Sequence, residues 1–271
     1  MLALAPTSRL NILAAPGWQH VSYRTFNVWR RHFDVWLKLW KTESWPPFAE
    51  GVLQLLAFGL GLGFYVQSVN GQSYLAFIAP AALGVSAMFG ASFECTFGSY
   101  FRMEEQRTFE AIVATPVSVE DVIAAEYLWG ASRAMFSTLA MLLVISAFGL
   151  VTSPWAVLIP LVALLEALAF AGLAELFTSM APSFGFFNYF ITLILTPMML
   201  FSGVFFPVSR LPWLVQDVIW ISPLFHAANL MRALAGGRLA PSLGWDGLFL
   251  AAIAAVACSA SLALMRRRLI V

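Results

Sequence analysis

The sequence predicts an all-α polytopic membrane protein with six transmembrane helices. Of its 271 residues, 61% are hydrophobic and 11% are charged, whereas a soluble domain averages about 45–50% apolar and about 25% charged residues. Four long stretches contain no Asp, Glu, Lys or Arg, namely 51–93, 134–165, 176–209 and 247–265. A helix needs roughly 20 apolar residues to cross a bilayer, so these stretches are long enough to hold several spans.

The N-terminal part is predicted to be a flexible cytoplasmic tail, 1–22, followed by an amphipathic helix, 23–47. The tail has no signal-peptide pattern, because Pro6 and Pro16 break its short apolar run. In the helix, aromatic and aliphatic residues recur at helical spacing opposite Arg and Lys side chains, as in helices that lie in the headgroup plane. These apolar residues are Phe26, Trp29, Phe33, Trp36, Leu37 and Trp40. The alternative is a core helix of a soluble domain, although the chain offers it no such domain to join.

Turn signals divide the remaining residues, 48–268, into one transmembrane domain. Breaks are expected at the Pro46–Pro47 pair, at 70–72, at 152–154 and at 181–183. Ser118 and Asp121 fit a capping box that opens the third span. We expect spans at about 50–69, 74–101, 118–150, 156–180, 184–205 and 246–265.

A dense run of charge separates the second and third spans. Four charged residues lie within seven positions, and three apolar residues follow the spacing of one helical face. Pro116 ends this segment because proline lacks an N–H donor. The pattern predicts a short amphipathic helix, 103–115, on which a partner could act; the alternative is a solvated loop helix without a partner. Its defining residues are Glu104, Glu105, Arg107, Phe109, Glu110, Ile112 and Val113.

The segment before the last span, 206–236, is apolar but interrupted. Pro207, Pro212 and Pro223 divide it into two helical pieces, about 211–221 and 224–235. Each piece is too short to span a bilayer, so the segment is predicted to form a re-entrant or interfacial hairpin.

The distribution of positive charge predicts the orientation. Cytoplasmic loops of membrane proteins carry an excess of Lys and Arg. With both termini and the loop at 102–117 in the cytoplasm, that side holds Arg9, Arg24, Arg30, Arg31, Lys38, Lys41, Arg102, Arg107 and Arg266–Arg268. The opposite side holds Arg210, Arg232 and Arg238, so the hairpin is expected to face outward.

Enzyme chemistry is not indicated. The chain has no Gly-Lys pair and therefore no phosphate-binding loop of the GxxxxGK[ST] type. His20, His32 and His226 lack metal-ligand spacing, and the two cysteines lie in apolar segments. We expect no catalytic residue, no metal site and no cofactor in this chain. The net charge of +1 also gives no indication of a nucleic-acid partner.

Ionisable residues inside predicted spans form the second group of candidates, because such residues are costly in a membrane and usually functional. At a rise of about 1.5 Å per residue, Arg133 lies about 22 Å from Ser118, and Glu166 about 21 Å from residue 180. We therefore expect an Arg133–Glu166 ion pair, which would either fix helix packing or line a substrate path. The whole group is Glu94, Glu126, Arg133, Glu166 and Glu175.

Two segments carry a family resemblance. The stretch FECTFGSYFRMEEQRTFEAIVATPVSVEDVIAAEYLWGASRA, 93–134, resembles the cytoplasmic loop region of ABC-2 type transporter permeases. The stretch FSGVFFPVSRLPWLVQDVIWISPLFHAANLMRALAGG, 201–237, resembles the segment before their last span. The order of elements agrees over about 23–268. The chain is most similar to the NodJ-type branch, the membrane subunits of lipo-oligosaccharide exporters.

The resemblance implies the six-span ABC-2, or type V exporter, fold in a bacterial inner membrane. Residues 23–45 would be the connector helix, and 206–236 an outward gate that includes Pro207, Pro212, Pro223, His226 and Arg232. The coupling helix, 103–115, would contact an ATPase through Glu104, Glu105, Arg107, Thr108, Phe109, Glu110, Ile112 and Val113. Two separately encoded ABC ATPase subunits would bind ATP and Mg, and the permease would be a homodimer.

The function expected from this resemblance is export of an amphipathic cargo out of the cytoplasm or the inner leaflet. The cargo would be a lipo-oligosaccharide, a lipid-linked saccharide or a related lipid. Drug or antibiotic efflux by the same fold is an alternative. Two further alternatives are a membrane scaffold that transports nothing and an ion-coupled transporter in which Glu94, Glu126 and Glu166 relay protons.

Overall fold

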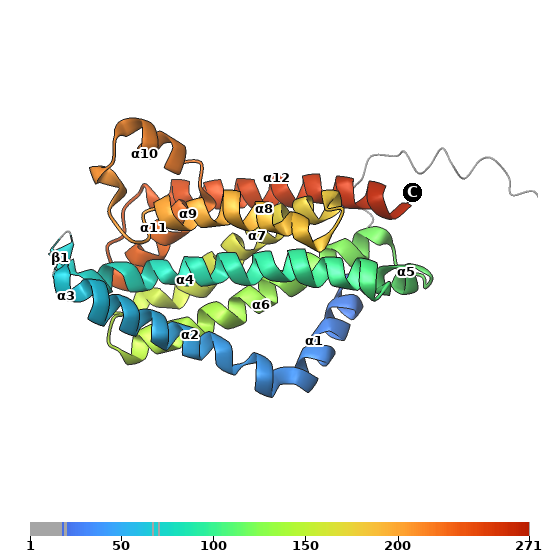
Figure 1. Cartoon of the computed structure of the whole chain (residues 1–271), viewed down its shortest axis with the longest axis horizontal. Coiled ribbons are helices and arrows are strands. Elements are labelled where there is room, and N and C mark those ends of the chain that lie inside the picture. The colour runs from blue at the N-terminus through green and yellow to red at the C-terminus, as the bar shows by residue number, and fades with distance from the viewer. Residues whose placement is uncertain (1–17, 19–20, 67, 70, 271) are drawn as a thin grey trace, which may run out of the picture.

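The computed structural model describes residue 18 and residues 21–66, 68–69 and 71–270. Of the predicted tail, 1–22, residues 1–17, 19 and 20 lie outside the described residues, whereas Ser22 is held by hydrogen bonds from its backbone N–H and its hydroxyl to Asp121. The chain forms a bundle in which most long helices run along one axis, with α5 and the C-terminus at one end and α10 and α11 at the other (Figure 1). The helical elements are α1 (Arg24–Glu43), α2 (Trp45–Leu56), α3 (Gly63–Tyr65), α4 (Tyr74–Phe93), α5 (Thr108–Val113), α6 (Val119–Ala147), α7 (Ile159–Met180), α8 (Phe187–Phe190), α9 (Thr196–Phe201), α10 (Trp213–Ile219), α11 (Pro223–Gly236) and α12 (Leu243–Ile270).

In the described part of the chain, six continuous helices are long and apolar enough to cross a membrane, which agrees with the predicted all-α protein of six spans. Several of them combine α-helical and π-helical segments, and a two-stranded hairpin of β1 (Ser68–Val69) and β2 (Gln72–Ser73) joins the first two. The six helices cover Trp45–Tyr65, Tyr74–Glu105, Val119–Ala147, Pro154–Met180, Phe184–Phe201 and Leu243–Leu269.

The core of the bundle depends on small residues, because they let helix backbones approach closely. A Cβ atom added to Gly172 on α7 would lie 2.7 Å from the backbone nitrogen of Cys258 on α12. One added to Gly90 on α4 would lie 3.0 Å from the Cα atom of Ala134 on α6. Helices α4, α6, α7 and α12 therefore form a tightly packed unit on which the other elements are arranged.

We predict that Gly172→Ala destabilises the protein by about 1–3 kcal/mol, the usual cost of overpacking. The added methyl group would collide with the backbone of α12, which cannot rotate away as a side chain can. A matched control is Gly236→Ala, because no atom lies within 4 Å of a Cβ built there. Thermal unfolding in detergent should show a lower midpoint for Gly172→Ala alone; equal midpoints would contradict the close approach.

Helix α1 is inclined to the bundle and packs on α6 (Figure 1). Its buried side is formed by Thr25, Val28 and His32. The rings of Phe26, Trp29 and Phe33 stack along the helix with centroid separations of 4.9 and 5.4 Å. These stacked rings lie beside the side of α1 that packs on α6, and His32 belongs to that buried side.

The helix predicted at 103–115 differs from the structure in where it begins. The helix that starts as α4 continues through two π-helical segments, Glu94–Gly98 and Phe101–Glu105. It breaks at Arg107, whose φ of 50° is in the left-handed region, and α5 follows. Residues 103–105 thus belong to the second span rather than to a separate helix at 103–115. The capping box of Ser118 and Asp121 at the start of α6 is confirmed.

Candidate functional site

A group of buried charges lies between α1, the C-terminal end of the second span and α6. Its centre is Arg102, in the second π-helical segment, whose side chain is 13% exposed. Arg102 donates from Nε and Nη2 to the two oxygens of Glu126, at 3.1 and 2.5 Å, and from Nη1 to Glu94 at 2.7 Å. Two parallel bonds from one guanidinium to one carboxylate fix both position and angle. Arg102 therefore joins the second span to α6 just before the break at residue 107.

Helix α1 reaches the same carboxylate through His32. Its Nε2 atom lies 3.2 Å from Oε1 of Glu126, and both side chains are almost completely buried. The His32 ring also lies beside the indole of Trp129, with a centroid separation of 5.8 Å. Glu126 thus faces a group from α1 and a group from the second span at the same time.

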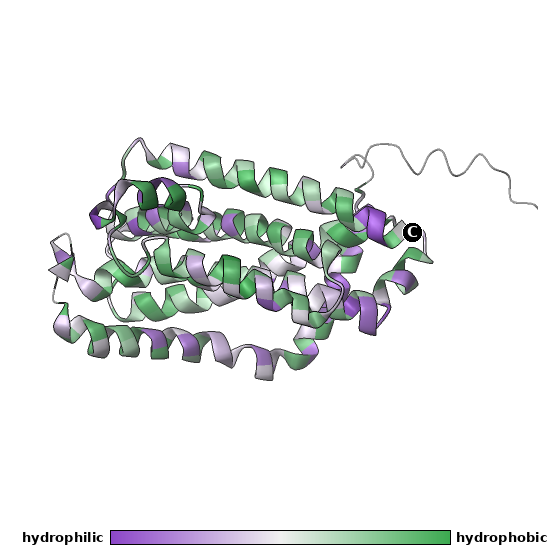
Figure 2. Cartoon of the chain, turned by 45° about the horizontal axis from the view of Figure 1, so that its top comes forward, coloured by the Kyte–Doolittle hydropathy of each residue, from purple (hydrophilic) through white to green (hydrophobic). Residues whose placement is uncertain are grey.

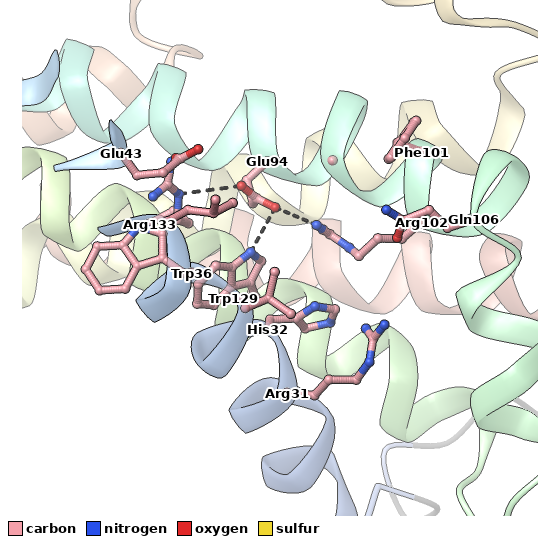
Figure 3. A pocket seen from close by; sticks show the side chains of 13 residues that line it. Arg31, His32, Trp36, Glu43, Glu94, Phe101, Arg102, Gln106, Trp129 and Arg133 are labelled. Carbon is pink, nitrogen blue, oxygen red and sulfur yellow. Dashed lines mark hydrogen bonds and ion pairs between the residues drawn. The ribbon is translucent and has the colours of Figure 1, made fainter. Parts of the chain in front are cut away.

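Glu94 connects Arg102 to Trp129 and Arg133 of α6. It accepts hydrogen bonds from Arg102 and from Nε1 of Trp129, the latter at 2.8 Å, and Arg133 lies 3.6 Å from its other oxygen (Figure 3). Arg133 also donates to Glu43 at the C-terminal end of α1, at 2.5 Å. A cavity of about 300 Å³ opens beside these side chains, between α1 and the two spans. We call the set Glu43, His32, Glu94, Arg102, Glu126 and Arg133 the charge network.

The predicted Arg133–Glu166 pair is wrong. Arg133 turns toward α1 and Glu94, whereas Glu166 faces Gly84 of α4, with both carboxylate oxygens 3.3 Å from a Cβ built there. Glu166 and Glu175 are fully buried, and neither forms an ion pair with any residue that the structure describes. Equal depth along the helix axes does not bring two side chains together, because the rotation of each helix about its own axis decides which side chains meet.

Sequence reasoning also overlooked three members of the charge network. These members are His32, Arg102 and Glu43, none of which is among the ionisable residues predicted to lie inside spans. Arg102 had a partial signal, because it follows Glu94 by eight residues and therefore lies about two turns further along the same helix. Both also lie in π-helical segments, which occur often at functional sites. No sequence pattern links Glu43 to Arg133, since they belong to different helices.

The residues around α5 divide into buried and exposed sets. Thr108 and Phe109 are buried, and Phe109 is only 1% exposed in the core of the bundle. Phe109 is therefore not accessible to a partner in this structure, contrary to its expected contact with an ATPase. Glu104 forms an ion pair of 2.7 Å with Arg268 near the C-terminus. Ile112 is half-buried, and the exposed residues among the predicted contacts are Glu104, Glu105, Arg107, Glu110 and Val113.

These features form a recognisable series along the chain: an N-terminal helix, a short helix after the second span, and a bent helix pair before the last. A family model described as "ABC-2 type transporter" matches residues 23–235. The chain belongs to this family. It is therefore an ABC-2 permease, a multi-pass protein of the inner membrane, and such permeases work with ABC ATPase partners.

Curated relatives support the assignment over almost the whole permease. The chain is 35% identical over 260 residues to "Nodulation protein J" of Rhizobium meliloti strain 1021, covering 95% of this chain and 96% of that protein. It is 36% identical over 221 residues to the protein of the same name from Sinorhizobium fredii, covering 82% of each. "Inner membrane transport permease YadH" of Escherichia coli K12 is 24% identical over 210 residues, covering 76% of this chain and 80% of that protein.

At the other end of the permease, α10 and α11 meet at a bend of 88°. Pro212 is the N-cap of α10, and Pro223 is the first residue of α11, where a missing N–H costs nothing. His226 is completely buried; its Nδ1 lies 2.5 Å from Oδ1 of Asp246 on α12 and its Nε2 lies 2.8 Å from the carbonyl oxygen of Trp220. His226 thus connects the bend to the start of the last span. Arg232 lies two turns further along α11, and Pro207 precedes a short turn at Val208–Arg210.

The observed partner of Arg133 gives a test of the site. We predict that a double-mutant cycle of Glu43→Gln with Arg133→Gln yields a coupling energy of about 0.5–1 kcal/mol, because the pair is partly exposed. The cycle of Glu166→Gln with Arg133→Gln should yield none, since the two side chains face different helices. Unfolding midpoints of the purified permease variants would measure both. Coupling to Glu166 instead of Glu43 would contradict the arrangement described above.

Proposed function

We propose that this chain is the membrane-spanning subunit of an ABC exporter that moves an amphipathic cargo out of the cytoplasm or the inner leaflet. The cargo would be a lipo-oligosaccharide, a lipid-linked saccharide or a related lipid. A homodimer of the permease would work with two copies of a separate ABC ATPase, which would bind ATP and Mg. The helix α5 would be the docking point for that ATPase.

The single observation that carries the proposal is the position of α5. The helix protrudes from one end of the bundle and exposes Glu110 and Val113, and the segment just before it exposes Glu105 and Arg107. A short exposed helix with an apolar residue among charges is the type of surface that forms a binding hot spot with a polar rim. Along the chain, α5 follows the break at Arg107 and lies between the second span and α6. A force on α5 would therefore act on two spans at once.

The charge network offers a route from α5 to α1. Arg102 lies five residues before the break at Arg107 and donates two hydrogen bonds to Glu126 on α6. Glu126 in turn lies beside His32 on α1. In the proposed mechanism, closure of the ATPases displaces α5, and Arg102 passes the movement to α6 and α1. The cavity of about 300 Å³ beside the network would change shape in that step.

The proposed orientation places both termini and α5 in the cytoplasm. Hydrophilic residues gather near the C-terminus and α5, while hydrophobic residues cover most of the helices (Figure 2). Basic residues from α1, from the region of the break at Arg107 and from Arg266–Arg268 are concentrated at or near this end. This is the asymmetry expected of a cytoplasmic side, and it would put the α10–α11 bend outside.

Ion-coupled transport is less well supported by the geometry. Glu94 and Glu126 face Arg102, Arg133 and His32 in close pairs. Glu166 faces α4 instead, so the three carboxylates do not form one chain of proton acceptors. A carboxylate held by a bidentate arginine is also a poor proton carrier, because the ion pair stabilises its charged form.

Reconstitution tests the proposal directly. The permease would be purified with its proposed partner ABC ATPase and placed in liposomes. We expect ATP hydrolysis to be stimulated by candidate lipo-oligosaccharides, and export to stop when the ATPase carries a defective phosphate-binding loop. Transport that continues without a working ATPase would exclude the proposal, and a stable complex that hydrolyses ATP without moving any amphiphile would favour a scaffold.

A further inference from the structure

The α10–α11 bend encloses a second cavity, distinct from the one beside the charge network. Its volume is about 370 Å³, within the usual range for small-ligand sites. The walls come from the start of α4, the turn at 203–209, α10 and α11. Aromatic rings of Phe77, Trp220 and Phe225 alternate with the polar side chains of Gln216, Asn229 and Arg232. The cavity is therefore neither a simple apolar gap nor an open polar surface.

Arg232 gives the cavity a positive charge that the protein leaves uncompensated. Its Nε donates to the carbonyl oxygen of Phe77 at 3.1 Å, and Nη2 donates to the carbonyl oxygen of Gly203. The guanidinium also lies over the Phe77 ring, 4.3 Å from its centroid. None of the described residues that line the cavity is acidic, and Arg232 forms no ion pair with a described carboxylate. The guanidinium is held by two carbonyl oxygens and the Phe77 ring, none of which carries a negative charge. Its positive charge can therefore attract an anion.

The backbone at residue 203 holds this arrangement in place. Gly203 has a φ of +74°, and a Cβ atom there would lie 2.6 Å from Cγ2 of Val208. Only glycine adopts this conformation without strain, so the turn can present its carbonyl oxygen to Arg232. Arg232 is thereby positioned before any ligand arrives, which reduces the entropic cost of binding.

The two amides complete a donor set for an oxyanion. Gln216 uses its amide nitrogen to donate to the carbonyl oxygen of Leu211 at 2.7 Å. The Asn229 side chain makes no hydrogen bond with any residue that the structure describes, so its amide NH₂ group is free to donate. A guanidinium next to an amide donor is a common way to bind phosphate, sulfate or carboxylate groups.

The opposite face of α10 lines an apolar groove. This groove has a volume of about 680 Å³ and runs between α10 and the fifth span, Phe184–Phe201. Leu214, Val215 and Val218 of α10 face Ile194 and Met198 across it. A cationic cavity and an apolar groove thus share one short helix, which matches the two ends of an anionic amphiphile.

We infer that the Arg232 cavity binds the anionic group of the exported amphiphile, while its alkyl chain lies in the groove beside α10. The ligand class is an amphiphile that carries a phosphate, sulfate or carboxylate. The inference rests on the proposed function for its direction, since that function puts the α10–α11 bend outside and makes it the last contact before release. Arg232 and Asn229 select for negative charge, and the groove selects for a chain.

Binding of dodecyl phosphate to the full-length permease tests the site without any ATPase. The permease would be placed in phosphatidylcholine nanodiscs, and binding measured by native mass spectrometry beside the neutral amphiphile dodecyl maltoside. Asn229→Asp adds a carboxylate next to Arg232 with almost no change in shape, and we expect at least tenfold weaker binding of dodecyl phosphate only. Ser209→Asp, at an exposed position on the cavity wall, should have the same effect if Asn229→Asp does not fold.

The matched control is Arg210→Gln, which removes a nearby positive charge outside the cavity and should retain binding within about threefold. Asn229→Ala removes one donor without adding charge, so it should weaken binding of dodecyl phosphate less than Asn229→Asp does. Unchanged binding in Asn229→Asp and Ser209→Asp, or equal loss of dodecyl maltoside, would overturn the inference. Complete displacement of dodecyl phosphate by phosphatidylglycerol would also overturn it, because the site would then hold membrane lipid. Failure of ATP-driven export alone would refute the proposed function and leave this binding result standing.

Discussion

Arg102→Met is expected to abolish folding of the permease, whereas the triple variant Arg102→Met, Glu94→Gln, Glu126→Gln should fold. In the single variant, Glu126 would keep a buried negative charge without its arginine, and breaking a buried pair in this way costs about 3–5 kcal/mol. The triple variant removes the carboxylates together with the cation, so no uncompensated charge remains. The yield of monodisperse protein after size-exclusion chromatography, together with its unfolding midpoint, would measure both effects.

The same triple variant tests whether the charge network only stabilises helix packing or also carries movement from α5 to α1. If the charge network carries movement from α5 to α1, export should fall at least tenfold although the protein is folded, because neutral side chains cannot hold the same geometry. ATP hydrolysis should then continue without stimulation by cargo. Glu104→Gln is a suitable control, since it breaks a pair whose carboxylate is 44% exposed and should cost less than about 1 kcal/mol. Normal export by the triple variant would reduce the network to a packing role.

The second large effect is expected at α5. We predict that Val113→Asp weakens ATPase binding by at least tenfold without lowering the unfolding midpoint. Val113 is 38% exposed and supplies an apolar contact among charges, so a carboxylate there would have to be desolvated in the interface. Co-purification of the permease with its ATPase, followed by a binding titration, would measure the change.

Two comparisons make this test specific to the exposed face of α5. Phe109→Ala should act in the opposite way, with a loss of about 3–5 kcal/mol in stability and no direct effect on docking, because Phe109 is buried. Arg210→Glu, an exposed change at the far end of the bundle, should affect neither quantity. If Val113→Asp binds the ATPase normally while Arg210→Glu does not, the ATPase docks elsewhere and the proposed orientation is also wrong.

The hydropathy of the sequence was sufficient to predict the spans of the bundle, because the apolar composition of each span is a local property of the chain. The charge-free stretches predicted six spans, and the prolines at 207, 212 and 223 predicted the interrupted segment in which α10 and α11 meet at 88°. The capping box at Ser118 was also readable, since its two residues are three positions apart. The helix expected at 103–115 was less accurate. Nothing local indicated that the second span would continue through residue 105 and break at a left-handed Arg107.

The partners of the buried charges required the tertiary structure. Apolar composition places Arg133, Glu126 and Glu166 inside spans, and the helical rise gives their depth, because both follow from the order of residues in one chain segment. Which side chains meet depends on the rotation of each helix about its axis and on the position of α1, and these are set by packing among distant segments. For this reason Arg133 faces Glu43 and Glu94, His32 faces Glu126, and Glu166 remains without an ionic partner among the described residues.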